Sequence, residues 1–165
     1  MKKIISLLLV VMTAATLSAK KYQHSLGMVA GLGIGAQYKL MVLDNFALIE
    51  EFGYFTCPDG NKGVGYGGAI NNLVLAYQAK GTEGQGIELD WYVGGQIKGG
   101  YVIADAGLIG IGAAVGLEAN MKQAPIAFSF DFRPGYGCIL ANWGGGTNAL
   151  HMCDWSFNLG VRYTF

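Results

Sequence analysis

The last eleven residues of the chain, 155–165, alternate without exception between large apolar side chains and small or polar ones. A repeat of two residues places consecutive side chains on opposite faces of an extended strand. The chain is therefore predicted to end in a β-strand with one wholly apolar face, and Arg162 is the single charge on the other face. The apolar positions are Trp155, Phe157, Leu159, Val161, Tyr163 and Phe165.

The same alternation predicts strands along most of the chain. They span about 24–31, 33–42, 46–56, 68–79, 86–102, 106–119, 125–138 and 153–165. Residues 25–40 keep one parity, with the apolar face on the even-numbered positions throughout. Residues 24–42 could therefore form one strand or two. Dividing them near Gly31 gives eight strands, and single-chain bacterial membrane barrels contain an even number. We therefore expect an all-β fold, an eight-stranded antiparallel up-and-down barrel.

Side-chain volume indicates which face of the strands lies inside. The interior of an eight-stranded barrel is just wide enough to be filled by side chains. The apolar face is too rich in Phe, Tyr and Trp to fit there, whereas the other face is mostly glycine, alanine and scattered charges. A soluble sandwich or lipocalin-like barrel would leave that glycine-rich, charge-poor face in water. The pattern instead favours a transmembrane barrel with its apolar face toward lipid.

The N-terminus has the layout of a secretory signal peptide. Lys2 and Lys3 precede an apolar stretch at 4–11, and small residues follow up to Ala19. The apolar stretch is shorter than the ~20 residues that a spanning helix needs. The residue directly after Ala19 is Lys20 and not a cysteine, which disfavours a lipoprotein. We expect a signal peptide at 1–19 and a barrel domain at 20–165, located in the bacterial outer membrane.

Parity also predicts a set of charges inside the barrel. Buried charges persist only when they are paired, so a hydrogen-bonded plug is favoured over a polar pathway for solutes. Without Lys2 and Lys3, the chain has 9 basic and 11 acidic residues. It therefore lacks the excess of basic charge that is typical of nucleic-acid-binding proteins. The predicted inward charges are Lys39, Glu51, Glu88, Asp90, Lys98, Glu118, Asp131, Arg133 and Arg162.

Two residues conflict with this pattern. Glu50 shares the parity of Leu48 and Phe52, which points its carboxylate toward lipid at a high energetic cost. A bulge at Glu50–Glu51, or a place at the membrane interface, would remove the conflict. Pro134 cannot donate a ladder hydrogen bond, so a bulge or a position at the rim is expected there.

The connections predict a topology with the N-terminus in the periplasm. Short periplasmic turns are expected at 42–45, 80–85 and 120–124, and longer extracellular loops at 57–69 and 139–152. Cys138 and Cys153 bracket the last loop and are candidates for a disulfide in an oxidising compartment, although Cys57 could be a partner instead. The cysteines and histidines lack metal-ligand spacing, so no metal site is expected.

Other polar motifs give weak signals for chemistry. His151, Asp154 and Ser156 lie close in sequence, as in a lipid-modifying site, but Ser156 has inward parity and no nucleophile–base pair stands out. The glycines at 31–35 and 144–146 lack the strand–loop–helix context of a phosphate site. We expect no enzymatic activity and no cofactor. The loop at 141–152 is the best candidate for contact with an extracellular ligand, whose identity the sequence does not give.

Three segments carry a resemblance to known proteins. Residues 157–165, with their terminal phenylalanine, look like the C-terminal signal of bacterial outer-membrane β-barrels. Residues 125–135, with a late Pro–Gly, and the aromatic-then-glycine segment 90–100 are similar to strands in a family of small outer-membrane barrel proteins. The resemblance covers most of the chain after the leader. It implies that the barrel assembly machinery reads Leu159, Val161, Tyr163 and Phe165.

These patterns together predict a location and a shape more than a reaction. The leading hypothesis is a non-enzymatic integral outer-membrane barrel that has a structural role or presents its extracellular loops for surface contact. A narrow pore for small solutes and a lipid-modifying outer-membrane enzyme are the alternatives. The expected partners are outer-membrane lipid and, during insertion, the assembly machinery.

Overall fold

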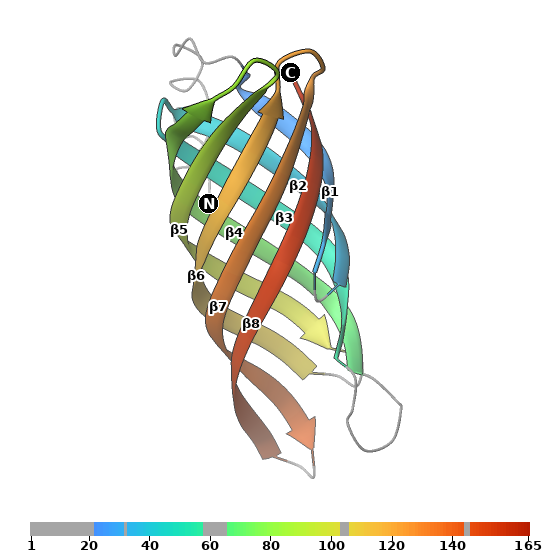
Figure 1. The fold of residues 1–165 in the computed structure, drawn as a ribbon. Helices are drawn as coiled ribbons and strands as arrows, with labels where there is room; N and C mark the ends of the chain where they lie inside the picture. Colours follow the sequence, from blue (N-terminus) through green and yellow to red (C-terminus); the bar gives the residue numbers. More distant parts are fainter. Residues whose placement is uncertain (1–21, 32, 58–65, 103–105, 144–145) are drawn as a thin grey trace, which may run out of the picture.

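The computed structural model describes residues 22–31, 33–57, 66–102, 106–143 and 146–165. They form a closed barrel of eight antiparallel strands, in which each strand pairs with its sequence neighbours and the last pairs with the first (Figure 1). The predicted all-β, eight-stranded up-and-down barrel is confirmed. The strands are β1 (His24–Ala30), β2 (Gly33–Leu43), β3 (Phe46–Cys57), β4 (Tyr66–Glu83), β5 (Ile87–Val102), β6 (Ala106–Met121), β7 (Ile126–Trp143) and β8 (Gly146–Thr164).

Two of the predicted connections are wrong. The expected turn at 80–85 is mostly strand, because β4 continues to Glu83 after a register shift between Lys80 and Thr82. The expected loop at 139–152 is also mostly strand, because β7 and β8 stay paired up to Trp143 and Gly146. Continued pairing satisfies the backbone N–H and C=O groups of both segments, and this outweighs the low strand propensity of their glycine and polar residues. The division of residues 24–42 into two strands is correct.

The ladder is regular at the two residues that conflicted with the pattern. Glu50 pairs with Tyr38 of β2 and with Leu73 of β4 in unbroken register, so the expected bulge at Glu50–Glu51 is absent. Pro134 does not form a bulge or lie at the rim either. The β6–β7 ladder has a gap at the level of Pro134 but resumes in the same register, as expected for a residue that lacks an N–H group.

The barrel has two unlike ends. At one, which we call the terminal end, lie the turns at 44–45, 84–86 and 122–125, together with the first and last described residues. There the main chains of His24 and Phe165 exchange hydrogen bonds of 3.0 and 2.9 Å, which fix the C-terminus against β1. At the opposite, loop end, β7 and β8 extend past their other neighbours as a paired hairpin (Figure 1).

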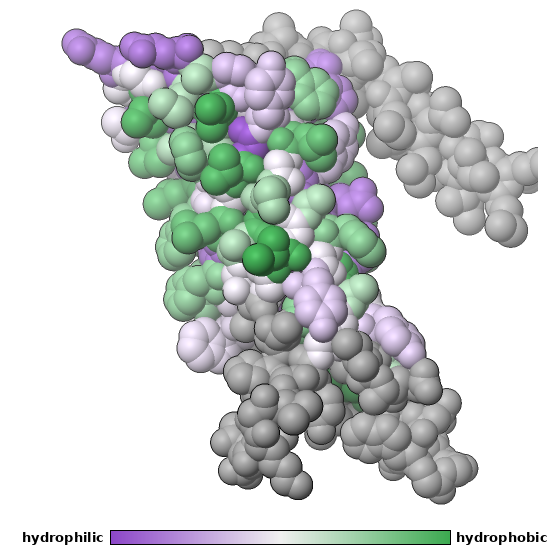
Figure 2. Space-filling model, turned by 90° about the vertical axis from the view of Figure 1, so that its right-hand side faces the viewer, coloured by the Kyte–Doolittle hydropathy of each residue, from purple (hydrophilic) through white to green (hydrophobic). Residues whose placement is uncertain are grey.

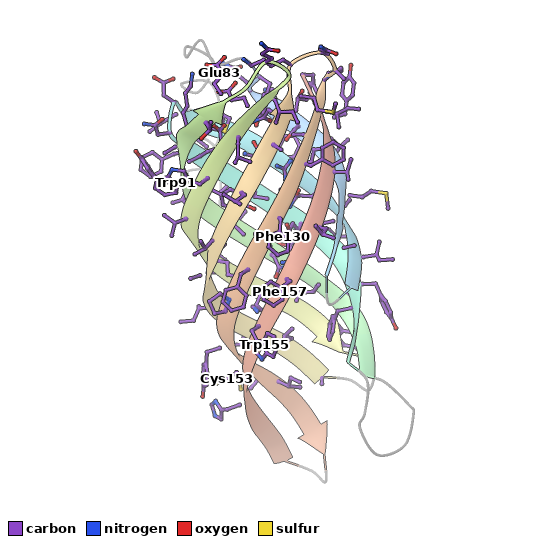
Figure 3. The ribbon with its side chains drawn as sticks, in the orientation of Figure 1. Glu83, Trp91, Phe130, Cys153, Trp155 and Phe157 are labelled. Carbon is purple, nitrogen blue, oxygen red and sulfur yellow. The ribbon has the colours of Figure 1, made fainter. Side chains whose placement is uncertain are left out.

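The distribution of side chains is the reverse of that in a soluble protein. Thirty large apolar side chains of the described residues are exposed, Ile111 and Trp155 the most at 65%. On the face shown in Figure 2, apolar residues cover much of the wall, and the most hydrophilic residues lie toward the terminal end. Phe130, Phe157 and Trp155 follow one another along this wall over β7 and β8 (Figure 3). None of the described residues forms a helix that is long and apolar enough to cross a bilayer.

Candidate functional site

The interior of the barrel is the main concentration of polar side chains. The structure places all nine of the predicted inward charges on the luminal side of their strands. Glu88 and Lys98 are half-buried. The other seven are nearly inaccessible, with exposed fractions of 6% or less: Lys39, Glu51, Asp90, Glu118, Asp131, Arg133 and Arg162.

The first group of contacts centres on Glu118 of β6. Both of its carboxylate oxygens accept hydrogen bonds from Lys39 Nζ, at 2.8 and 2.7 Å. Arg162 of β8 forms a second ion pair with Glu118, and the hydroxyl of Tyr22 donates to it. Burial, together with the Glu118 carboxylate, raises the pKa of the Tyr22 hydroxyl, so this group remains a donor. One buried carboxylate is therefore satisfied by two cations and a phenol.

An amide extends this group toward β5. Gln78 of β4 accepts a hydrogen bond from Lys39 Nζ at 2.6 Å and donates one to Asp90 Oδ2 at 2.9 Å. Asn120 also donates to Asp90 Oδ2, at 3.4 Å. The amides thus provide Asp90 with donors that do not require another buried charge.

The second group of contacts centres on Arg133 of β7. Its guanidinium donates to both oxygens of Glu51, at 2.5 and 2.6 Å, and to both oxygens of Asp131, at 2.6 and 3.0 Å. Asp131 accepts further hydrogen bonds from Tyr92, at 2.6 Å, and from Asn158, at 2.9 Å. The planar guanidinium suits this double clamp because its donors are fixed in a fork.

Gln37 of β2 joins the two groups. Its amide nitrogen donates to Glu51, and its amide oxygen accepts from Arg162. The result is one hydrogen-bonded network that connects side chains from seven strands, β2 to β8. Its charged members come from six of these strands, and Gln78 adds β4. We call it the luminal network. It contains three buried cations and four buried carboxylates, so almost every charge has an opposite partner.

Inward-facing glycines make room for the luminal network. A Cβ atom at Gly116 would lie 2.5 Å from the ring of Tyr92 and 2.7 Å from Cβ of Asp131. At Gly160 a Cβ would lie 2.4 Å from Oγ of Ser129. Real Cβ atoms do not approach neighbours so closely, so the high glycine content on this face allows large polar side chains to fill a narrow barrel.

Apolar side chains adjoin the luminal network toward both ends of the barrel. Near the terminal end, Tyr22 packs against a buried cluster. Its members are Met41, Ala47, Ile49, Val74, Ala76, Tyr92 and Ala114. Near the loop end, Phe55, Ile70 and Ile139 pack against Ala106 and Leu108. Side chains therefore fill the described interior along much of its length.

The sequence identified the charged members of the luminal network but missed part of it. Gln37 and Gln78 have inward parity, and this signal could have found them. Tyr22 lies before β1 and belongs to no alternating segment, so only the fold reveals that it reaches Glu118.

The residues that suggested catalysis are not brought together. His151 faces outward from β8, where its Nδ1 lies 2.8 Å from the hydroxyl of Tyr136. Ser156 projects from the opposite face of β8 and accepts a hydrogen bond from Asn158 at 3.3 Å. The side chain of Asp154 lies outside the described residues. Within the described ranges, no three His, Cys, Asp or Glu residues are grouped as metal ligands.

The candidate disulfide is not formed. Cys138 and Cys153 are free thiols on adjacent strands, but Cys138 lies opposite His151 and Cys153 lies opposite Tyr136. Such diagonal positions are about 7–8 Å apart, whereas a disulfide needs Cβ atoms about 3.5–4.5 Å apart. The side chain of Cys57, the other candidate partner, lies outside the described residues.

The candidate assembly signal forms a continuous row on the outer wall. Its residues project from β8 and the chain end, beside β1, with exposed fractions of 49% or more. They are Leu159, Val161, Tyr163 and Phe165.

Comparison with known proteins gives no family for this chain. No protein-family model matches it, and no curated protein matches it significantly.

Proposed function

We propose that the chain is an integral outer-membrane barrel, exported through a signal peptide at 1–19, with a structural or surface-contact role. The observation that carries this proposal is the reversed distribution of side chains. Thirty large apolar groups are exposed while seven charges are buried. A soluble monomer rarely exposes contiguous apolar patches larger than a few hundred Å². A bilayer would cover this wall, and the closed ladder leaves few backbone groups unpaired in lipid.

Aromatic side chains support a transmembrane orientation of the barrel. Near the terminal end, the rings of Phe46, Tyr77 and Trp91 contact one another, with centroids 5.6 and 6.2 Å apart. Nearer the loop end, Tyr54 and Trp155 are at least half exposed. Aromatic residues at two levels are typical of the two interfaces of a membrane barrel. In our proposal the terminal end faces the periplasm, and the loop end faces the exterior.

The luminal network supports a structural role over a pore. Ions need a hydrated path, but the charges here are satisfied by one another and are nearly inaccessible. The projecting β7–β8 hairpin would then be the part of the molecule available for surface contact. We further propose that the assembly machinery recognises the outward row of β8 that ends at Phe165. The described geometry offers no assembled catalytic group, and we propose no reaction.

Membrane fractionation tests this proposal directly. The full-length protein should sediment with outer membranes, resist extraction at alkaline pH, and migrate faster on an electrophoresis gel when it is not boiled. Such heat-dependent migration reports a folded barrel. Deletion of 2–11 should keep the chain in the cytoplasm. Recovery of the intact protein in the soluble periplasmic fraction would contradict the proposed location.

A further inference from the structure

A polar pair lies on the outer wall among large apolar side chains, away from both ends of the barrel. Glu50 of β3 and Asn71 of β4 are both exposed, and the Asn71 amide donates to Glu50 Oε1 at 3.4 Å. Their neighbours on this wall are apolar: Phe52 is 63% exposed and Leu75 is 56% exposed. We call Glu50 and Asn71 the wall pair.

The wall pair lies between the two aromatic levels of the barrel. Glu50 is four residues from Phe46 and four from Tyr54 along β3. In the proposed membrane placement, on which this inference rests, the carboxylate is therefore near the middle of the hydrocarbon region. No bulge turns it away, since β3 pairs regularly on both sides.

The wall pair lacks the partners that buried charges normally have. Among the described residues no cation pairs with Glu50, and its contact with Asn71 is long for a hydrogen bond to a carboxylate. Acyl chains offer no hydrogen bonds, so polar side chains at this depth are costly unless another protein group satisfies them. A second molecule that covers the wall pair would remove this cost.

The surface beside the wall pair is shallow. Gly99 of β5 lies directly opposite Asn71 on the outer wall, and Gly95 lies further along the same strand. A Cβ at Gly95 would meet nothing within 4 Å, and one at Gly99 only a carbonyl oxygen at 4.0 Å. Small residues of this kind let two membrane proteins approach closely.

We propose that a second copy of this chain covers the wall pair in a two-fold symmetric dimer through β3, β4 and β5. The pair is self-complementary: Asn71 has a second N–H to donate, and Glu50 has a second oxygen to accept it. Because the two groups already meet at 3.4 Å, they lie at nearly the same depth. A two-fold axis along the membrane normal preserves depth, so each Asn71 faces the partner's Glu50.

Site-specific crosslinking in native outer membranes tests the dimer. A cysteine-free protein (Cys57→Ser, Cys138→Ser, Cys153→Ser) receives one reporter, Leu73→Cys, which lies opposite Glu50 on β4. The matched control is Val161→Cys on β8, on the opposite side of the barrel. Mild oxidation should give a product of twice the monomer mass from the first reporter and not from the second.

Substitution of the wall pair then separates dimerisation from folding. In the Leu73→Cys protein, Glu50→Leu and Asn71→Leu should each reduce the dimer product by about tenfold, because each substitution is present in both copies and removes both symmetry-related polar contacts. Both variants place an apolar group against lipid, so they should still fold, as shown by heat-dependent migration.

The outcomes distinguish the two proposals. Absence of folded protein from the membrane fraction would contradict the membrane placement. Folded, membrane-bound protein that gives no dimer, or equal products from both reporters, would overturn the dimer alone. A crosslink from Leu73→Cys to a protein of another mass would overturn it too, in favour of a different partner.

Discussion

The luminal network and the wall pair are two polar clusters in one barrel with opposite surroundings. Inside, Glu118 has two cations and a phenol as partners and is fully inaccessible. On the wall, Glu50 has one long hydrogen bond and is exposed. The luminal carboxylate is thus surrounded by several partners within the chain, whereas the wall carboxylate has a single weak one. Loss of one partner should therefore be costly inside the barrel and nearly neutral on the wall.

The largest effect is expected from Arg133→Ala. This change leaves Glu51 and Asp131 buried without their cation, and breaking a buried ion pair costs about 3–5 kcal/mol. Urea-induced unfolding of the protein in lipid vesicles would measure it. The control is Lys80→Ala, because the Lys80 side chain is 75% exposed and its ion pair with Glu88 is long, at 3.8 Å. The control should lose about 0–1 kcal/mol. Equal losses of stability in Arg133→Ala and Lys80→Ala would contradict the expected difference between buried and exposed ion pairs.

A smaller effect is expected from Tyr22→Phe. Removal of the hydroxyl takes one donor from Glu118, and a hydrogen bond to a charged group contributes about 1.5–3 kcal/mol. Tyr38→Phe on the outer wall is the matched control, because the Tyr38 hydroxyl contacts the ring of His24, at 2.7 Å, and no carboxylate contact of this hydroxyl is seen among the described residues. Its loss should be about 0.5–1.5 kcal/mol. Urea-induced unfolding in lipid vesicles would measure both variants. A larger loss of stability in Tyr38→Phe than in Tyr22→Phe would contradict the expectation.

Steric exclusion inside the barrel gives a third comparison. Gly116→Ala forces a methyl group against Tyr92 and Asp131, and such overpacking costs about 1–3 kcal/mol. Gly95→Ala is chemically identical but places the methyl in open space on the wall. It should be neutral or slightly stabilising, because alanine restricts the unfolded chain more than glycine does. Thermal unfolding in detergent would compare the two, and equal midpoints would mean that the lumen has spare volume.

The smallest effect is expected from Glu50→Leu in a monomeric preparation. In the proposed membrane placement, the change removes a carboxylate from lipid at the loss of one long hydrogen bond, so the free energy of unfolding should stay the same or rise. Unfolding in vesicles at a high lipid-to-protein ratio, where dimers dissociate, would measure it. A loss comparable to that of Arg133→Ala would mean that the wall pair stabilises the single barrel.

Side-chain parity explains how much of this fold the sequence could predict. Alternation placed Lys39, Arg133 and Arg162 on the luminal face, because a closed barrel permits only two orientations for each residue. Parity says nothing about strand length, so it does not predict where β4 or the β7–β8 hairpin ends. There, glycine and polar residues look like loops, but backbone pairing continues. Contacts across the lumen, such as Tyr22 with Glu118, depend on three-dimensional closure and leave no local pattern.

The most direct test of the central claim, that the apolar face meets lipid and the polar face lines a filled interior, is a spin-label scan along β8. Single cysteines at 155–160 in the cysteine-free protein would carry the label, and collision with oxygen and with a water-soluble nickel complex would be compared. We predict strong oxygen contact at Phe157 and Leu159, and weak contact with both reagents at Ser156 and Asn158. Strong nickel contact at Phe157 and Leu159 would show that this wall faces water, and would contradict the claim.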